Sequence, residues 1–212
     1  PLTMVLEDKG CAAPTVTAGG DTLGVRCPDH PMTLALIQAL GAPLAAPSAN
    51  PEGAPSPKSA EAVFDYFDGR IHGILDGGPC TVGVESTIVD LTESPARLLR
   101  PGGVTPEELM EVLGDLVVDK AVTAQVDKDA VVKAPGMKYR HYAPKAPVLL
   151  FEGAPEDSYA ALAAEAGQAY DGILCFEEYY PALKAEHTCR VYSLGYSWDH
   201  RTHARRLFAL LR

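Results

Sequence analysis

The chain has 212 residues, of which 47% are hydrophobic and 22% charged, and its formal net charge at neutral pH is −10. This composition is typical of a globular protein with one large domain or two small ones, and no apolar run reaches the ~20 residues that a membrane helix needs. The acidic net charge disfavours a protein that binds nucleic acid by itself, because contacts between basic side chains and phosphates dominate such binding. It favours a small-molecule site.

The five cysteines are odd in number and widely spaced, and none belongs to a C-x-x-C pair. This spacing disfavours a disulfide framework and a structural zinc site, and it indicates a reducing, cytoplasmic location. The pair His200 and His203 lacks a third ligand nearby, so no metal site is predicted there. The start at Pro1 without a Met and the stop at Arg212 inside a predicted helix lead us to expect a fragment at both ends.

Hydrophobic periodicity predicts a chain of the α/β class. Strands are expected at residues 2–6, 22–27, 71–76, 88–91, 98–100, 148–152, 172–176 and 190–194. Helices are expected at residues 31–40, 59–67, 106–113, 157–168 and 199–211. The helix at 106–113 carries the clearest start signal, because Thr105 and Glu108 form a capping-box pattern before it.

The proline-rich stretch 45–58 is the expected centre of the site. Its prolines restrict the backbone and hold Ser48, Asn50 and Ser56 on a stiff frame. Pro57 fits the first position of the following helix and Ser56 fits its N-cap, which would form an anion-binding helix N-terminus. The alternative is ordinary turn and cap chemistry that binds nothing.

Other hydroxyl and arginine side chains lie at predicted strand ends. Strand alternation places Thr22 and Arg26 on one face, with Gly24 between them. Ser86 precedes a strand and Arg100 ends one. With Ser48 and Ser56 they would form a pocket for a carboxylate and a phosphate, because arginine matches both. No P-loop, G-x-G-x-x-G or G-x-S-x-G motif is present, so composition and spacing indicate an anion-binding α/β protein and no more.

The second part of the chain differs in character. Residues 115–132 are polar with little periodicity, and residues 134–147 are proline-bounded, basic and aromatic. A plain linker is one interpretation of residues 134–147, and a segment that contacts a ligand surface is the other. The alternating strands and helices from residue 148 predict a second, doubly wound domain.

Several short motifs, in this order and spacing, resemble the YrdC-like threonylcarbamoyl-AMP synthases. They are Pro1-Leu2-Thr3, Ala46-Pro47-Ser48-Ala49-Asn50, Ser56-Pro57, Glu85-Ser86-Thr87 and Arg100-Pro101-Gly102. Residues 135–144 are similar to the interdomain linker of the long form of that family. The resemblance implies the C-terminal part of a YrdC-like twisted-sheet domain at 1–118, a linker at 119–146, and a smaller, incomplete Rossmann-like domain at 147–212.

The resemblance also implies an activity. The family converts L-threonine, bicarbonate and ATP into threonylcarbamoyl-AMP and pyrophosphate, and a tRNA-modifying transferase complex then uses this intermediate to modify adenosine. Mg²⁺ is expected with the ATP, and no metal-binding or catalytic residue is assigned. The implied ATP contacts are Thr22, Ser48, Ser56, Arg100 and Tyr139. The implied threonine contacts are Arg26, the backbone at Ala46, and Ser86.

The chain departs from the family pattern at two positions: Lys58 stands where a threonine is usual, and Glu52 where a serine is usual. The family's N-terminal strands and helices are also missing upstream of Pro1, so we expect the isolated chain to be a poor catalyst. Two other functions stay open. One is a non-catalytic module that binds a nucleotide or double-stranded RNA, which the net charge disfavours. The other is a carbamoyl-transfer domain of the hydrogenase-maturation type, which the linker and second domain disfavour.

Overall fold

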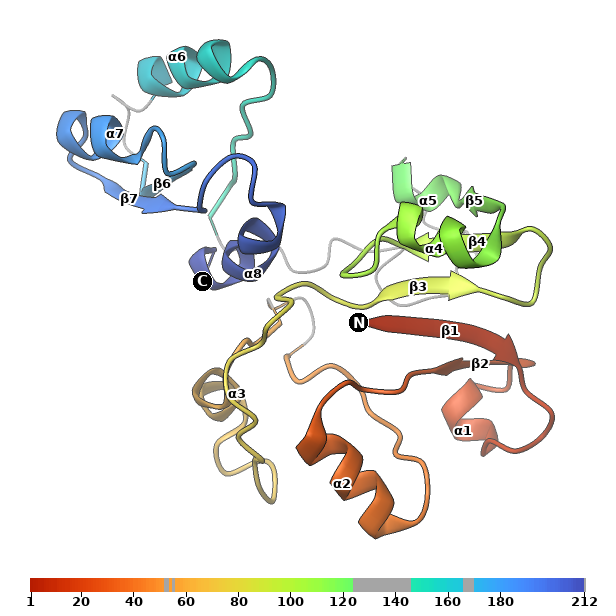
Figure 1. Ribbon diagram of the computed structural model, residues 1–212. Helices are drawn as coiled ribbons and strands as arrows, with labels where there is room; N and C mark the ends of the chain where they lie inside the picture. Colours follow the sequence, from red (N-terminus) through yellow and green to blue (C-terminus); the bar gives the residue numbers. More distant parts are fainter. Residues whose placement is uncertain (52–53, 55, 124–145, 166–169, 212) are drawn as a thin grey trace.

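The computed structural model describes residues 1–51, 54, 56–123, 146–165 and 170–211. Its first part is built on a five-stranded sheet with the strand order β2-β1-β3-β4-β5 (Figure 1). The strands are β1 (Leu2–Glu7), β2 (Thr22–Val25), β3 (Thr87–Asp90), β4 (Ala96–Arg100) and β5 (Leu116–Val118). β1 and β3 are parallel, as are β4 and β5, while the β1–β2 and β3–β4 pairs are antiparallel.

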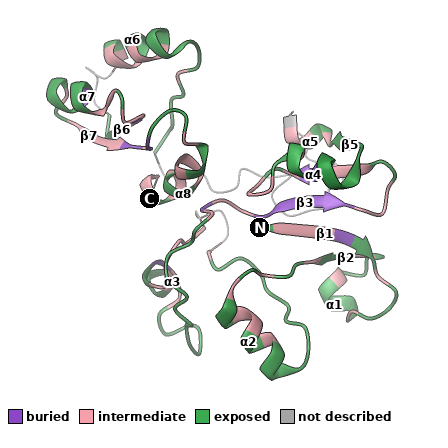
Figure 2. Cartoon of the chain, in the orientation of Figure 1, coloured by how far each residue is buried: buried purple, intermediate pink, exposed green. Residues whose placement is uncertain are grey.

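Alternating side chains of this sheet pack on its two faces. Val5, Ile88 and Leu99 form one buried cluster, and Val89 and Leu98 form another with Leu109 of α4 (Pro106–Leu113). β3 is the most buried strand of this sheet, as Figure 2 shows, because it lies at the centre and its alternating side chains enter both clusters. The predicted capping box is confirmed: Glu108 N donates to Thr105 Oγ1 at 3.2 Å, and Thr105 N donates to Glu108 Oε2 at 2.9 Å.

The connection from β2 to β3 carries two helices, α2 (Pro31–Leu40) and α3 (Ala60–Phe67). α2 has the predicted bounds and ends at Gly41, which has a φ of 68°. The prediction for the start of α3 is wrong: its N-cap is Ser59, whose hydroxyl accepts from Ala62 N at 3.3 Å, and not Ser56. Ser56 bonds instead to a distant carboxylate.

Two predicted strands are wrong. Residues 71–76 form no strand, and Ile71, Ile74 and Leu75 are exposed. Residues 148–152 also form no strand, and Leu150 is 73% exposed. Both segments have the apolar character of a strand, but neither pairs with a neighbouring strand among the described residues, and a strand exists only through such pairing.

The second part contains β6 (Gly172–Cys175) and β7 (Arg190–Ser193), which pair in parallel. Its helices are α6 (Pro155–Glu165), α7 (Tyr180–Glu186) and α8 (His200–Leu210). Ile173, Cys175 and Leu183 form its buried cluster. A β-strand, a helix and a parallel β-strand in sequence form the unit of doubly wound domains, so the α/β prediction is confirmed. The sequence pattern missed α7, as well as the short elements α1 (Pro14–Thr17), β5 and α5 (Lys120–Thr123).

Candidate functional site

Parallel pairing of β1 with β3 brings two hydroxyl side chains together. Leu2 lies opposite Thr87 in this ladder, so the neighbouring residues Thr3 and Ser86 meet at the start of β3. Their side-chain oxygens are 2.8 Å apart, although the residues are 83 positions apart in sequence. Ser86 is only 7% exposed, so its hydroxyl is held in place.

Two arginines converge on this pair of hydroxyls. Arg26, which follows β2, donates from Nε to Thr3 Oγ1 at 3.0 Å and from Nη2 to Ser86 Oγ at 2.8 Å. Arg100, at the end of β4, donates from Nη2 to Ser86 Oγ at 3.2 Å and from Nε to the Ser86 carbonyl oxygen at 3.1 Å. Thr3, Arg26, Ser86 and Arg100 thus form one cluster, which we call the arginine–hydroxyl cluster.

The charge of the cluster is positive. Arg26 makes no ion pair with any acidic side chain in the part of the chain that the structure describes. Its Nε and Nη2 atoms donate to the two hydroxyls, and these hydrogen bonds orient the planar guanidinium. A guanidinium fixed in this way and not neutralised by a carboxylate attracts anions, above all carboxylate and phosphate groups.

The turn after Arg100 is locked against Ser86. A Cβ atom at Gly102 would lie 2.3 Å from the carbonyl oxygen of Glu85 and 2.4 Å from Thr87 N, so only glycine fits. The buried Thr87 side chain braces the same turn by donating to the Val104 carbonyl oxygen at 2.6 Å and accepting from Val104 N at 2.9 Å. These contacts hold the end of β4 beside the start of β3.

The proline-rich stretch reaches the cluster through Ser56. The Ser56 hydroxyl donates to Glu85 Oε1 at 2.6 Å, and Glu85 directly precedes Ser86. Further back, the Asn50 side-chain amide donates to the carbonyl oxygens of Pro51 at 3.1 Å and Ala54 at 3.0 Å. The Asn50 side chain therefore bridges two backbone carbonyl groups of this stretch.

The structure does not bring all the predicted site residues together. Thr22 opens β2 opposite Glu7, and Ala46 and Ser48 lie exposed in the stretch before α3, without a side-chain hydrogen bond to the cluster. Tyr139 lies outside the described residues. Gly24 does face the cluster, because a Cβ atom there would lie 3.6 Å from Thr3 Cγ2.

The contact residues predicted from the sequence do not include Thr3 and Glu85, although both belong to motifs that the sequence analysis quotes. Thr3 carried a weak signal, a hydroxyl within an otherwise apolar strand, but its partners follow only from the parallel β1–β3 pairing. Glu85 is part of a polar run after Gly83, and its role depends on contact with Ser56, 29 residues away.

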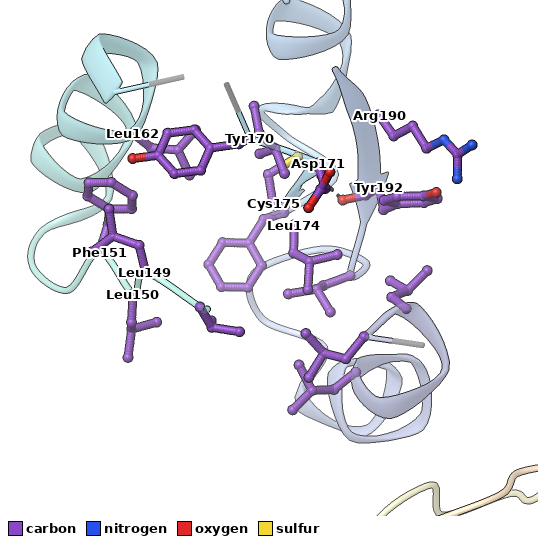
Figure 3. A pocket seen from close by; sticks show the side chains of 18 of the residues that line it. Leu149, Leu150, Phe151, Leu162, Tyr170, Asp171, Leu174, Cys175, Arg190 and Tyr192 are labelled. Carbon is purple, nitrogen blue, oxygen red and sulfur yellow. Dashed lines mark hydrogen bonds between the residues drawn. The ribbon is translucent and has the colours of Figure 1, made fainter. Parts of the chain in front are cut away.

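Other features bear on what the chain can bind. Among the described residues, no group of three or more His, Cys, Asp or Glu side chains could hold a metal ion. No helix in the described ranges is long and apolar enough to cross a membrane. A half-open hollow of about 1790 Å³ is lined mainly by the second part of the chain, where Leu149, Leu150 and Phe151 stand across from Leu174 and Cys175 (Figure 3), and also by residues of the first part such as Lys58. None of the predicted site residues that the structure describes lines it.

Two family models together match nearly the whole chain. The Sua5, YciO and YrdC model, described as telomere recombination, matches residues 1–102. The model described as the C-terminal domain of threonylcarbamoyl-AMP synthase matches residues 104–212, which is just over half of the chain. This chain belongs to the threonylcarbamoyl-AMP synthase family.

Two members of this family show high sequence identity to the chain. A Bacillus subtilis threonylcarbamoyl-AMP synthase is 51% identical over 156 residues, covering 73% of this chain and 44% of the relative. A Schizosaccharomyces pombe threonylcarbamoyl-AMP synthase is 40% identical over 222 residues, covering 100% of this chain and 54% of the relative. The chain therefore spans about half the length of these curated relatives.

A solved structure agrees with the fold. The crystal structure of P. abyssi Sua5 complexed with L-threonine is 40% identical and superposes with a TM-score of 0.86, covering 100% of this chain and 60% of that chain. Because the match extends over the whole chain, it includes both the five-stranded sheet and the part that holds β6, β7 and α8.

Proposed function

We propose that this chain supplies part of the active site of a threonylcarbamoyl-AMP synthase, which forms threonylcarbamoyl-AMP and pyrophosphate from L-threonine, bicarbonate and ATP. The observation that carries the proposal is the convergence of Arg26 and Arg100 on the Ser86 hydroxyl, at 2.8 and 3.2 Å. Two guanidinium groups at one hydroxyl suit substrates that carry a carboxylate and a phosphate. The relative with L-threonine in its crystal structure supports the amino-acid half of this proposal.

The proposed contacts divide between the two substrates. Arg26, Ser86 and the backbone at Ala46 would bind threonine, with its carboxylate on the Arg26 guanidinium. Arg100 would contact ATP, together with Thr22, Ser48, Ser56 and Tyr139. The cluster supports this division, because Arg26 reaches Ser86 from the β2 side and Arg100 from the β4 side, so each arginine has its own approach to the shared hydroxyl.

The chemistry then depends mainly on positioning. The amine of L-threonine and bicarbonate would first give N-carboxylated threonine with loss of water. A carbamate oxygen of this species then attacks the α-phosphorus of ATP, the bond between the α-phosphorus and the bridging oxygen breaks, and pyrophosphate leaves. Holding the two reactants in line lowers the entropic part of the barrier, and nearby cations stabilise the developing charge. Mg²⁺ would be held by the phosphates with at most one or two carboxylates, and Glu85, beside Ser56, is suited to be one.

We further propose that residues 1–118, 119–146 and 147–212 act as catalytic part, linker and second domain in a cytoplasmic enzyme. Its product would pass to a transferase complex that modifies adenosine in tRNA. Because the chain spans about half of its relatives, the isolated 212 residues would be a poor catalyst.

Calorimetric titration of ATP, with and without L-threonine, tests the proposal. It compares this chain with a version extended at both ends to the relatives' length. We expect threonine-dependent ATP binding in the extended protein and weak binding in the 212-residue chain. A well-folded extended protein that binds no nucleotide would overturn the proposal. Tight, steeply salt-dependent binding of double-stranded RNA by that protein would favour the RNA-binding alternative.

A further inference from the structure

Helix α8 of the second part lies directly on a glycine of the first part. Gly83 has a φ of +86°, and a Cβ atom there would lie 2.3 Å from the Cα atom of Arg205 and 2.6 Å from the carbonyl oxygen of Ala204. The helix backbone itself is therefore the neighbour, and no side chain fits between them. Figure 1 shows α8 beside the segment that leads into β3.

A second contact involves the same face of α8. The ammonium group of Lys58 lies 5.0 Å from the centroid of the Phe208 ring, within the range of a cation–π interaction. Phe208 follows Arg205 by three positions, so both contacts come from one side of the helix. The hollow described above also runs between these parts, because Lys58, Ser59, Leu207 and Leu210 all line it.

The two segments that contact α8, one around Lys58 and one around Gly83, are hydrogen-bonded to each other and connected to the arginine–hydroxyl cluster. Cys80 N donates to the Lys58 carbonyl oxygen at 2.9 Å, which ties the stretch after Ser56 to the segment before β3. The Ser56 hydroxyl donates to Glu85 at 2.6 Å, and Ser86 is the next residue. Both residues that touch α8 thus lie close in sequence to the site: Lys58 is two residues from Ser56, and Gly83 is three residues from Ser86.

We propose that α8 is a positioning element for the nucleotide side of the candidate site, with Phe208 and Lys58 as positioning residues. This inference rests on the proposed function, because Ser56 and Arg100 are ATP contacts only within it. In this arrangement the charged end of Lys58 is directed to the Phe208 ring of the second domain. Docking of α8 would fix the Ser56–Glu85 pair and thereby the phosphate end of the site.

The sharpest test compares two glycines of the extended protein. Gly83→Ala places a methyl group against the α8 backbone, whereas Gly78→Ala, at a φ of +82°, meets nothing within 4 Å and carries the same backbone cost. We expect Gly83→Ala to weaken ATP binding by about 2- to 30-fold relative to Gly78→Ala, the usual range for coupling through packed contacts. Threonine binding measured without ATP should change less than ATP binding does, because Arg26 and Arg100 also hold the Ser86 hydroxyl in place.

A double-mutant cycle supplies a second, milder test. Phe208→Leu, Lys58→Thr and the double variant should weaken ATP binding to the same extent, because each removes the same contact. Additive effects, or a loss with Lys58→Thr alone, would overturn the inference and make Lys58 a direct contact of the nucleotide. Equal ATP affinity of Gly83→Ala and Gly78→Ala would also overturn it. Failure of the unsubstituted extended protein to bind ATP would instead overturn the proposed function.

Discussion

The Nη2 atom of Arg26 donates to the hydroxyl of Ser86 at 2.8 Å, although the two residues lie 60 positions apart. This bond joins the end of β2 to the start of β3 across β1, so it depends on the strand order β2-β1-β3. It also leaves the guanidinium oriented by hydroxyls, with no ion pair to an acidic side chain among the described residues. The anion binding that we propose for the site would thus be a property of the fold and cannot be found in any one motif.

Removal of Arg26 or Arg100 should separate the two substrates. In the extended protein, Arg26→Ala should weaken threonine binding and Arg100→Ala should weaken ATP binding, each by ~1.5–3 kcal/mol, because a hydrogen bond to a charged group is lost. Calorimetry measures threonine binding without ATP, and ATP binding at saturating threonine, so that the loss of one ligand is not read as the loss of the other. Equal loss of both ligands in both variants would mean that the arginines serve folding and do not select substrates.

Thr3 should act through Arg26. Thr3→Val keeps the shape of the side chain but removes the oxygen that accepts from Arg26 Nε at 3.0 Å, and Thr3→Ser keeps that oxygen. We expect Thr3→Val to weaken threonine binding by ~1 kcal/mol, the usual worth of one hydrogen bond, and Thr3→Ser to restore it. ATP affinity is the internal control and should not change. Identical threonine affinities of the Val and Ser variants would remove Thr3 from the site.

Much of the local structure follows from the sequence, but its assembly does not. The capping box at Thr105 and the stop of α2 at Gly41 are encoded within one turn of helix, so they could be predicted. Ser56 shows the opposite case. Its Ser-Pro pair is typical of a helix start, yet a hydrogen bond to Glu85 holds it outside the helix. A local sequence pattern does not reveal a contact between residues that lie 29 positions apart in the chain.

The close approach at Gly102 gives a prediction about stability. Gly102→Ala would place a methyl group 2.3 Å from the Glu85 carbonyl oxygen, so the turn after β4 or the start of β3 must move. We expect the free energy of unfolding to fall by ~1–3 kcal/mol, the usual cost of overpacking. Gly73→Ala is the matched control, since a Cβ atom there meets nothing within 4 Å. Urea denaturation of both variants measures the difference, and equal midpoints would contradict the described packing.

Thiol labelling should distinguish one cysteine from the others. Burial, together with the nearby Glu177 acting in the same direction, raises the pKa of Cys175 to about 11. At pH 8 roughly one Cys175 thiol in a thousand would be ionised, and the thiolate is the reactive form. The exposed Cys11, Cys27 and Cys80 should therefore react with a thiol reagent in the native protein, and Cys175 only after unfolding. Native labelling of Cys175 as fast as Cys80 would be the contrary result.

Asp199 should make the start of α8 sensitive to acid. Its carboxylate accepts from Thr202 Oγ1 at 2.6 Å and from Thr202 N at 3.1 Å, and these bonds lower its pKa. A carboxyl group with a lowered folded pKa stabilises the folded state fully above its unfolded pKa of about 3.9, and this contribution disappears as the pH falls through the lower folded value. Acid should therefore weaken α8, the helix that contacts Gly83 through its backbone and Lys58 through Phe208.

The substitution Asp199→Asn isolates this effect. Asparagine keeps an oxygen that can accept from Thr202 N but does not titrate, so the variant should lose the acid-dependent part of the stability and keep the cap. Subtracting its unfolding free energy from that of the unsubstituted chain, at each pH from 6 down to about 2, removes the contribution of the other carboxylates. We expect this difference to favour the unsubstituted chain at pH 6 and to shrink below about pH 4. A difference that stays constant with pH would show that the Asp199 charge does not stabilise α8, and its bonds to Thr202 would then act only as a neutral cap.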